Sequence, residues 1–306
     1  GVGVHNYSVS DKALQYHILP MYSFDKKVIN GEAAIQYTKP LQGRSEFLEL
    51  GAAVRKYSFS DRGVVRENDA YVIGNYNYLK VQPQVTYHIQ KSTLRSAQSK
   101  SICLALDHVF FSPQFDFVSS DTLPGPIFSK PRGNSFVTLT YRAGNDRQIE
   151  GYSLELNAEY GRLTYDNVVG EKQRVPSGSD SSTIYPLSGT AIGSSDFVKL
   201  SGVFVRRLDI GIKNKPLNIR VYGAAMIKPS DVSRYNLALG SSEKAGYYDY
   251  KFDDYLMHRN ADVGLFQNQI NSRTNASKFV GHIGAPDRWL VSAVMTIPLS
   301  GKIPLK

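Results

Sequence analysis

Hydrophobic and polar residues alternate along most of this chain. From Leu79 to Gln90 the odd positions hold Leu, Val, Pro, Val, Tyr and Ile, and the even positions hold Lys, Gln, Gln, Thr, His and Gln. The same period of two recurs at 29–38, 48–59, 134–142, 151–160, 216–228 and 288–297. Because neighbouring side chains of a β-strand point to opposite faces, the pattern predicts strands with one apolar and one polar face. We count about twelve to fourteen such segments of about 9–13 residues, and no useful helical period.

The predicted strands are joined in two ways. Short polar joints lie at 24–27, 144–146 and 211–215. Long joints lie at 112–133, 166–196 and 229–246. Short turns on one side and long loops on the other are typical of an outer-membrane barrel. No repeat of propeller or solenoid length is present, which argues against both folds.

The apolar faces fit two architectures, a soluble sandwich or barrel with apolar faces inward and a membrane barrel with apolar faces outward. Strand length favours the membrane barrel, because sandwich strands are shorter. The second face carries groups that an aqueous interior would solvate, namely Glu32, Gln36, Glu49, Arg55, Gln84, Glu155, Glu159 and Arg220. We therefore expect an all-β, antiparallel transmembrane β-barrel of about 12–16 strands.

Tyrosine and proline positions refine this prediction. Tyrosines near predicted strand ends would form the aromatic girdles of a membrane protein: Tyr16, Tyr22, Tyr37, Tyr57, Tyr71, Tyr87, Tyr141, Tyr152 and Tyr165. Proline donates no hydrogen bond to a β-ladder, so Pro83 and Pro20 each predict a bulge or a sheet edge.

Composition adds little chemistry. The net charge is +9, but the basic residues are scattered, which indicates solvated charge and argues against nucleic acid as a partner. Cys103 is the only cysteine, so an internal disulfide is excluded, and its apolar surroundings predict a core or wall residue. The chain opens without the features of a signal peptide and contains no apolar run long enough for a membrane-spanning helix.

No catalytic, cofactor-binding or metal-binding residue is assigned. No zinc-peptidase, nucleophile-elbow or phosphate-loop motif is present. His88 and His108 lie in alternating strands and are predicted to be structural. The run 247–264 contains Asp249, Asp253, Asp254, His258 and Asp262, but their spacing fits no EF-hand. An inward-folded loop or a charged strand wall is the preferred interpretation of that run.

Four stretches resemble a known group of proteins. They are 1–38, 48–59, 197–226 and 247–299, the last beginning YYDYKFDDYLMHRNADVG. Together they resemble the C-terminal region of large Gram-negative proteins related to aminopeptidase N, the gluzincin metallopeptidase-like proteins, in which a zinc domain precedes a β-rich, barrel-like segment. The chain is also distantly similar to barrels of the outer-membrane assembly factor superfamily. The likeness is diffuse and covers most of the chain.

The resemblance implies a location, partners and a parent protein. The family's H-E-x-x-H signature is absent, so no catalytic residue is carried over and no cofactor is expected in this segment. Residues 1–306 would be one barrel domain of a longer chain, with zinc and any aminopeptidase activity in an upstream domain. The C-terminal IPLSGKIPLK lacks a terminal aromatic, so we expect the barrel to be incomplete there. The implied partners are the outer-membrane bilayer, lipopolysaccharide or anionic lipid, and the upstream peptidase-like domain.

Three functions remain open from the sequence. The first is a non-catalytic outer-membrane barrel that anchors or accompanies a metallopeptidase-like domain. The second is a barrel for transport or protein insertion, in which inward charges and long loops act on a passing substrate. The third is a soluble β-rich binding module.

Overall fold

The computed structural model describes the chain over most of its strands. The residues described are 3–6, 13–24, 27–41, 46–65, 70–89, 91, 93, 96–118, 127–128, 132–145, 147, 150–167, 173–174, 183–184, 191–211, 216–228, 251, 269–270, 277–278 and 288–297. Within them the fold is all-β, as predicted, and every strand pairing is antiparallel.

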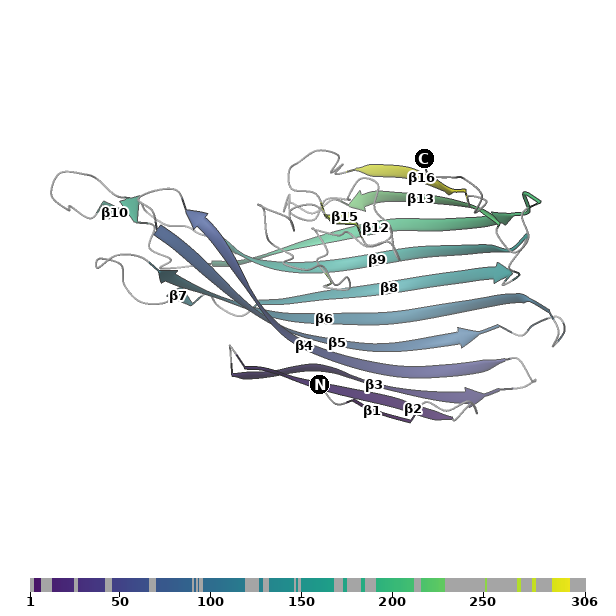
Figure 1. Ribbon diagram of the computed structural model, residues 1–306, viewed down its shortest axis with the longest axis horizontal. Coiled ribbons are helices and arrows are strands. Elements are labelled where there is room, and N and C mark those ends of the chain that lie inside the picture. The colour runs from purple at the N-terminus through teal and green to yellow at the C-terminus, as the bar shows by residue number, and fades with distance from the viewer. Residues whose placement is uncertain are drawn as a thin grey trace, which may run out of the picture.

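One large sheet contains the main strands in the order β1-β2-β3-β4-β5-β6-β8-β9-β12-β13-β16 (Figure 1). Their bounds are β1 Val4–His5, β2 Leu14–Ser23, β3 Val28–Pro40, β4 Phe47–Val65, β5 Ala70–His88, β6 Gln98–Val118, β8 Arg132–Asn145, β9 Tyr152–Asn167, β12 Ala191–Leu208, β13 Leu217–Lys228 and β16 Trp289–Thr296. The short β7 (Ile127–Phe128) pairs with β6. Two separate ribbons are β10 (Gln173–Arg174) with β11 (Thr183–Ile184), and β14 (Gln269–Ile270) with β15 (Ser277–Lys278). The sheet is curved and open, because no ladder joins β1 or β2 to β16 among the described residues.

The links between strands differ at the two ends of the sheet. At one end, which we call the turn end, the links are 41–46, 89–97, 146–151 and 209–216. At the other, the loop end, they are 24–27, 66–69, 119–131, 168–190 and 229–288. The three longest links lie at the loop end, but so do the two shortest, 24–27 and 66–69, so the expected division into short turns and long loops holds only in part.

Several strands are longer than predicted. β4 and β5 have 19 residues each and β6 has 21, and in Figure 1 they extend beyond the other strands at the loop end. The predicted loops 112–133 and 166–196 were therefore too wide, since β6 continues to Val118 and β12 begins at Ala191. The alternation of apolar and polar residues continues past Pro113, at Phe115, Asp116 and Phe117. This pattern favours the extension of β6 to Val118.

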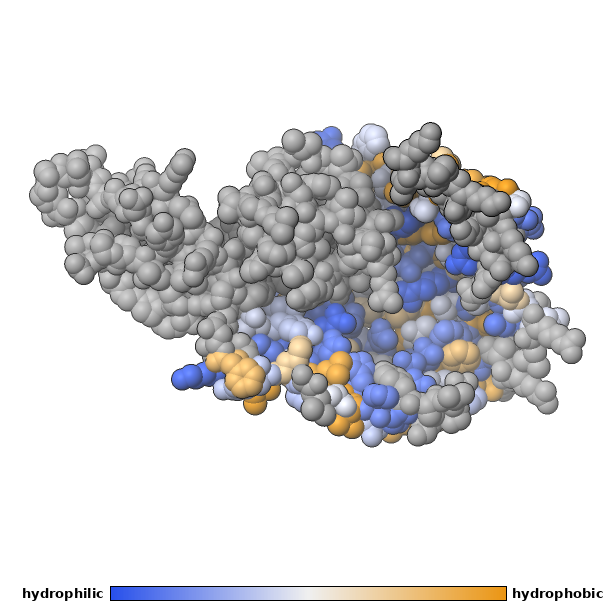
Figure 2. Space-filling view, in the orientation of Figure 1, coloured by the Kyte–Doolittle hydropathy of each residue, from blue (hydrophilic) through white to orange (hydrophobic). Residues whose placement is uncertain are grey.

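Exposure follows the predicted alternation. On the convex outer face Leu104, Leu139 and Leu156 are 51%, 48% and 46% exposed. On the concave inner face Asp107 and Glu159 are only 2% and 5% exposed. Large apolar side chains therefore point away from the hollow of the sheet and charged side chains point into it. Where the hollow is visible in Figure 2, its surface is mostly hydrophilic.

The inner face also contains apolar side chains, which the sequence did not lead us to expect. Val109, Phe136, Leu163 and Phe197 form one fully buried cluster. Val203, Tyr222, Ala224 and Leu290 form a second cluster, and Met226 packs against both. These side chains lie on the concave side of β6, β8, β9, β12, β13 and β16, so this part of the inner face contains buried apolar clusters.

The two prolines behave differently. Pro20 lies on β2 beyond its short pairing with β1, and among the described residues this is a sheet edge, as predicted. Opposite it, Gly31 has φ 140°, and a Cβ there would lie 2.3 Å from the Leu19 carbonyl oxygen. Pro83, however, lies in a central strand, and its prediction as a bulge or edge was wrong. The β5–β6 ladder skips Gln82 and Pro83 and then resumes in the same register, because the missing N–H breaks the ladder without inserting a residue.

Candidate functional site

The outer face carries a band of exposed apolar side chains. On β6 the band runs from Ile102 through Leu104 and Leu106 to Phe110, and these side chains are 40%, 51%, 46% and 47% exposed. His108 lies on the same face between Leu106 and Phe110, with its ring centroid 4.2 Å from that of Phe110. Eight residues at about 3.4 Å each make this band roughly 27 Å long along the strand. Corresponding outward positions on β2, β3, β4, β9, β12, β13 and β16 are also exposed and apolar. An apolar band of about 25 Å is what the hydrocarbon of an outer membrane would cover.

Aromatic side chains lie at both margins of this band. Near the turn end the outward tyrosines are Tyr16, Tyr37, Tyr87, Tyr141 and Tyr152. Tyr87 and Tyr141 flank Ile102 in one cross-strand row. Toward the loop end the outward aromatics are Tyr22, Phe24, Phe110 and Trp289, which are 50%, 84%, 47% and 69% exposed.

The predicted girdle tyrosines are thus mostly on the outer face. Tyr57 is an exception, because it lies on the inner face with its ring centroid 5.7 Å from that of Tyr78. The side chains of Tyr71 and Tyr165 lie outside the described part of the chain.

Among its described ion pairs, the inner face holds two that are deeply buried, each between neighbouring strands. On β5 and β6, Lys80 Nζ lies 3.2 Å from Asp107 Oδ1. On β9 and β12, Glu159 and Lys199 are directly opposite in register, with Nζ 3.6 Å from Oε1. All four side chains are at least nine-tenths buried. Pairing offsets the high free-energy cost of burying a lone charge. All four residues occupy polar positions of the alternating pattern.

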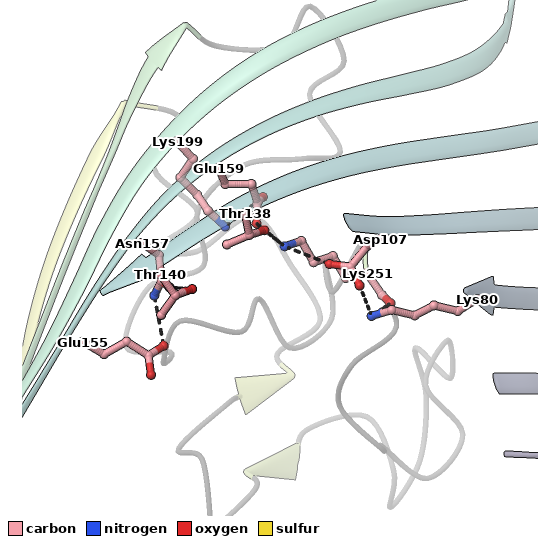
Figure 3. A network of polar contacts seen from close by, with 9 residues as sticks. All are labelled: Lys80, Asp107, Thr138, Thr140, Glu155, Asn157, Glu159, Lys199 and Lys251. Carbon is pink, nitrogen blue, oxygen red and sulfur yellow. Dashed lines mark hydrogen bonds and ion pairs between the residues drawn. The ribbon is translucent and has the colours of Figure 1, made fainter. Parts of the chain in front are cut away.

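Lys251 bridges the two pairs across β8 (Figure 3). Its Nζ forms ion pairs with Glu159 Oε2 and, at 3.5 Å, with Asp107 Oδ2. It also donates a 2.8 Å hydrogen bond to Thr138 Oγ1 on β8, and it lies 5.6 Å from the centroid of the Phe136 ring. In return, Lys80 Nζ donates a 3.1 Å hydrogen bond to the Lys251 carbonyl oxygen. A residue from the link between β13 and β16 is thereby fixed against the inner wall.

A second, more exposed chain of polar contacts lies nearer the turn end. Thr140 Oγ1 donates a 2.6 Å hydrogen bond to Asn157 Oδ1, and Asn157 Nδ2 donates one of 3.1 Å to Glu155 Oε1. Arg142 Nε completes the chain at 2.7 Å from Glu155 Oε2. These contacts join β8 to β9 side by side and leave Arg142 about half exposed.

The sequence-predicted inward residues all lie on the inner face. Arg55 Nε is 3.1 Å from Glu32 Oε2, and His88 Nε2 is 3.2 Å from Glu49 Oε2. His88 also stacks on Phe47, whose ring centroid is 4.0 Å away.

The remaining singled-out residues have structural surroundings or lie outside the described residues. His108 Nδ1 is 2.7 Å from Ser135 Oγ. Cys103 is buried on the inner face, as predicted for a core or wall residue. Asp249, Asp253, Asp254, His258 and Asp262 lie outside the part that the structure describes.

Sequence reasoning found Glu159 but missed its partners. Asp107, Thr138, Lys199 and Lys251 were not singled out, because a polar residue at an inward position gives no sign of which distant residue it contacts. The register of Glu159 with Lys199 could be inferred only once β9 and β12 were known to be neighbours.

The described residues hold no group of three His, Cys, Asp or Glu side chains able to bind a metal. They also hold no helix long and apolar enough to cross a membrane. Comparison with protein families, with curated proteins and with solved structures finds no match to this chain.

Proposed function

We propose that this chain forms the wall of a non-catalytic β-barrel in the outer membrane of a Gram-negative bacterium, where it anchors or accompanies a metallopeptidase-like domain. The observation that carries the proposal is the polarity of the two faces: leucines point outward and exposed, while Lys80, Asp107, Glu159 and Lys199 are buried inside. A soluble protein would bury the leucines and expose the charges.

Lipid contact accounts for the outer face. Contiguous exposed apolar surface of this extent is typical of a protein or membrane interface. Aromatic side chains at its two margins suit the headgroup regions, where a ring with a polar edge is favoured. Exposed rim cations such as Lys39 and Lys100 would meet anionic lipid or lipopolysaccharide headgroups there.

A location in the membrane requires that the backbone groups at the sheet edges be hydrogen-bonded. In hydrocarbon every backbone N–H and C=O must be paired within the protein. Among the described strands, β1–β2 and β16 lie at the two edges of the sheet. In the membrane these edges must be closed, by each other or by further strands. The proposal of a closed barrel includes this step.

The interior favours an anchor over an open conduit. Lys251 lies against the concave wall and is fixed by contacts to Asp107, Thr138 and Glu159. Lys251 thereby occupies part of the inner face and leaves less room there for a passing substrate. The association with a peptidase-like domain rests on the sequence resemblance, and zinc would belong to that domain.

The single tryptophan provides the test. Trp289 lies on the outer face of β16 and is 69% exposed without lipid. In vesicles containing brominated phospholipids, we expect its fluorescence to shift to the blue and to be quenched most by bromines near the headgroups. Strong quenching by aqueous iodide, together with a monodisperse, detergent-free monomer, would refute the membrane assignment.

A transport or insertion barrel is the second candidate, favoured by the hydrophilic surface of the hollow in Figure 2. Conductance across a planar bilayer separates it from the anchor: an anchor with a filled interior gives no steady current, whereas a conduit does. A soluble binding module would need its large apolar side chains inside, opposite to the arrangement of Leu104, Leu139 and Leu156.

A further inference from the structure

Two carboxylates, a hydroxyl and an aromatic ring surround Lys251 Nζ. We infer that Asp107, Phe136, Thr138 and Glu159 make a binding site for a primary ammonium group, and that Lys251 occupies this ammonium site in the present structure. The inference goes beyond the proposed function and does not depend on a membrane location.

The site matches the chemistry of an alkylammonium ion. Such an ion has three N–H donors, and the wall offers Asp107 Oδ2, Glu159 Oε2 and Thr138 Oγ1 as acceptors. The Phe136 ring, 5.6 Å from the nitrogen, adds a cation–π contact. These four groups come from the adjacent strands β6, β8 and β9, so the sheet itself positions them.

The two carboxylates of the site keep charged partners on the strands when Lys251 is absent. Lys80 remains beside Asp107, and Lys199 remains beside Glu159, so the strand-borne charges sum to zero. Asp107 is 2% exposed, and its Oδ1 accepts no hydrogen bond from the described residues although Lys80 Nζ is 3.2 Å away. Vacating the site therefore leaves neither carboxylate alone in a buried environment, which would otherwise be strongly destabilising.

The occupant is separable from the site. Lys251 lies 113 residues from Thr138 along the chain and belongs to the link between β13 and β16. Its side chain is 13% exposed, against 3% and 5% for the two carboxylates. The ligand class is a primary alkylammonium, such as the lysine side chain of a partner polypeptide. A quaternary ammonium carries the same charge but has no N–H to donate, which makes it the discriminating control.

Chemical rescue tests this assignment. In the Lys251→Ala chain, propylammonium should lower the unfolding equilibrium constant about tenfold when its concentration is roughly ten times its Kd. Tetramethylammonium at the same ionic strength should have no such effect. The matched control is Lys228→Ala, which removes an exposed lysine at the end of β13 and should show no difference between the two cations. Equal responses of Lys251→Ala to both cations, or no response to either, overturn the inference.

A measurement on the wild-type chain covers the case in which Lys251→Ala does not fold. Propylammonium should compete with Lys251 for the site, so chymotrypsin cleavage after Tyr250 or Phe252 should become severalfold faster than in tetramethylammonium. Equal cleavage in the two salts contradicts the inference. Both measurements work in detergent or in plain buffer, so a failed lipid-quenching test leaves them valid.

Discussion

The two halves of the inner face differ although their outer faces are alike. On the inner face of β2 to β5 a hollow is lined mainly by small and amide side chains, among them Gln15, Ala34, Gln36, Gly51, Ala53, Gln82 and Gln84. The same inner face also carries the partly exposed charged residues Glu32, Glu49 and Arg55. We call this the open half. Over β6 to β16 the inner positions hold the buried clusters and the ammonium site, and we call this the packed half.

The difference reflects what surrounds the side chains of each face. An outer face in contact with a uniform solvent such as lipid needs only apolar side chains, and every long strand supplies them in the same alternation. Inner side chains must instead fit one another, so Phe136 and Phe197 can fill space only where Gly161 makes room. We therefore expect stability to depend on inner residues of the packed half and hardly at all on those of the open half.

The largest expected effect is at Phe136, which is fully buried and has its ring centroid 6.2 Å from that of Phe197. Phe136→Ala should lower the free energy of unfolding by about 3–5 kcal/mol, because it removes a large apolar side chain and leaves a cavity. Denaturant unfolding of the folded chain measures the loss. Gln36→Ala, at a half-buried position of the open half, should cost less than about 1 kcal/mol. Similar losses for both variants would show that the packed half is not the stabilising part.

A smaller effect is expected from a single carboxylate in each half. Glu159→Gln removes the charge that Lys199 and Lys251 share in a site only 5% exposed, and should cost about 3 kcal/mol. Glu49→Gln removes the partner of His88, with side chains 25% and 29% exposed, and should cost less than about 1 kcal/mol. The same unfolding measurement compares them, and a Glu49→Gln loss as large as that of Glu159→Gln would contradict the division into halves.

The sequence predicted the strands and the direction in which they face, because both depend on the local period of two. Leu156 outward and Glu159 inward follow from their positions alone. Contacts across long distances were not predictable in this way: nothing near Lys251 in the sequence indicates Asp107 or Glu159. The packed cluster was missed for a similar reason, since Phe136 interrupts the polar face of its strand and gains a partner only when β12 is placed beyond β9.

The smallest expected change in the free energy of unfolding concerns two inner-face glycines, Gly161 in the packed half and Gly51 in the open half. A Cβ at Gly161 would lie 2.2 Å from Phe197 Cε1 and 2.9 Å from Phe136 Cδ1, both in a fully buried cluster. Gly161→Ala should therefore force the two rings apart and cost about 1–3 kcal/mol.

At Gly51 the nearest atoms belong to the flexible Gln84 side chain, with Cγ and Nε2 both 3.1 Å from the added Cβ. Gly51→Ala should be neutral within about 0.5 kcal/mol, because Gln84 can turn into the hollow and alanine suits a strand better than glycine. Unfolding midpoints of the two variants under identical conditions test the pair. If Gly51→Ala destabilises the chain as much as Gly161→Ala, the open half is as tightly packed as its neighbour and the contrast between the two inner walls is lost.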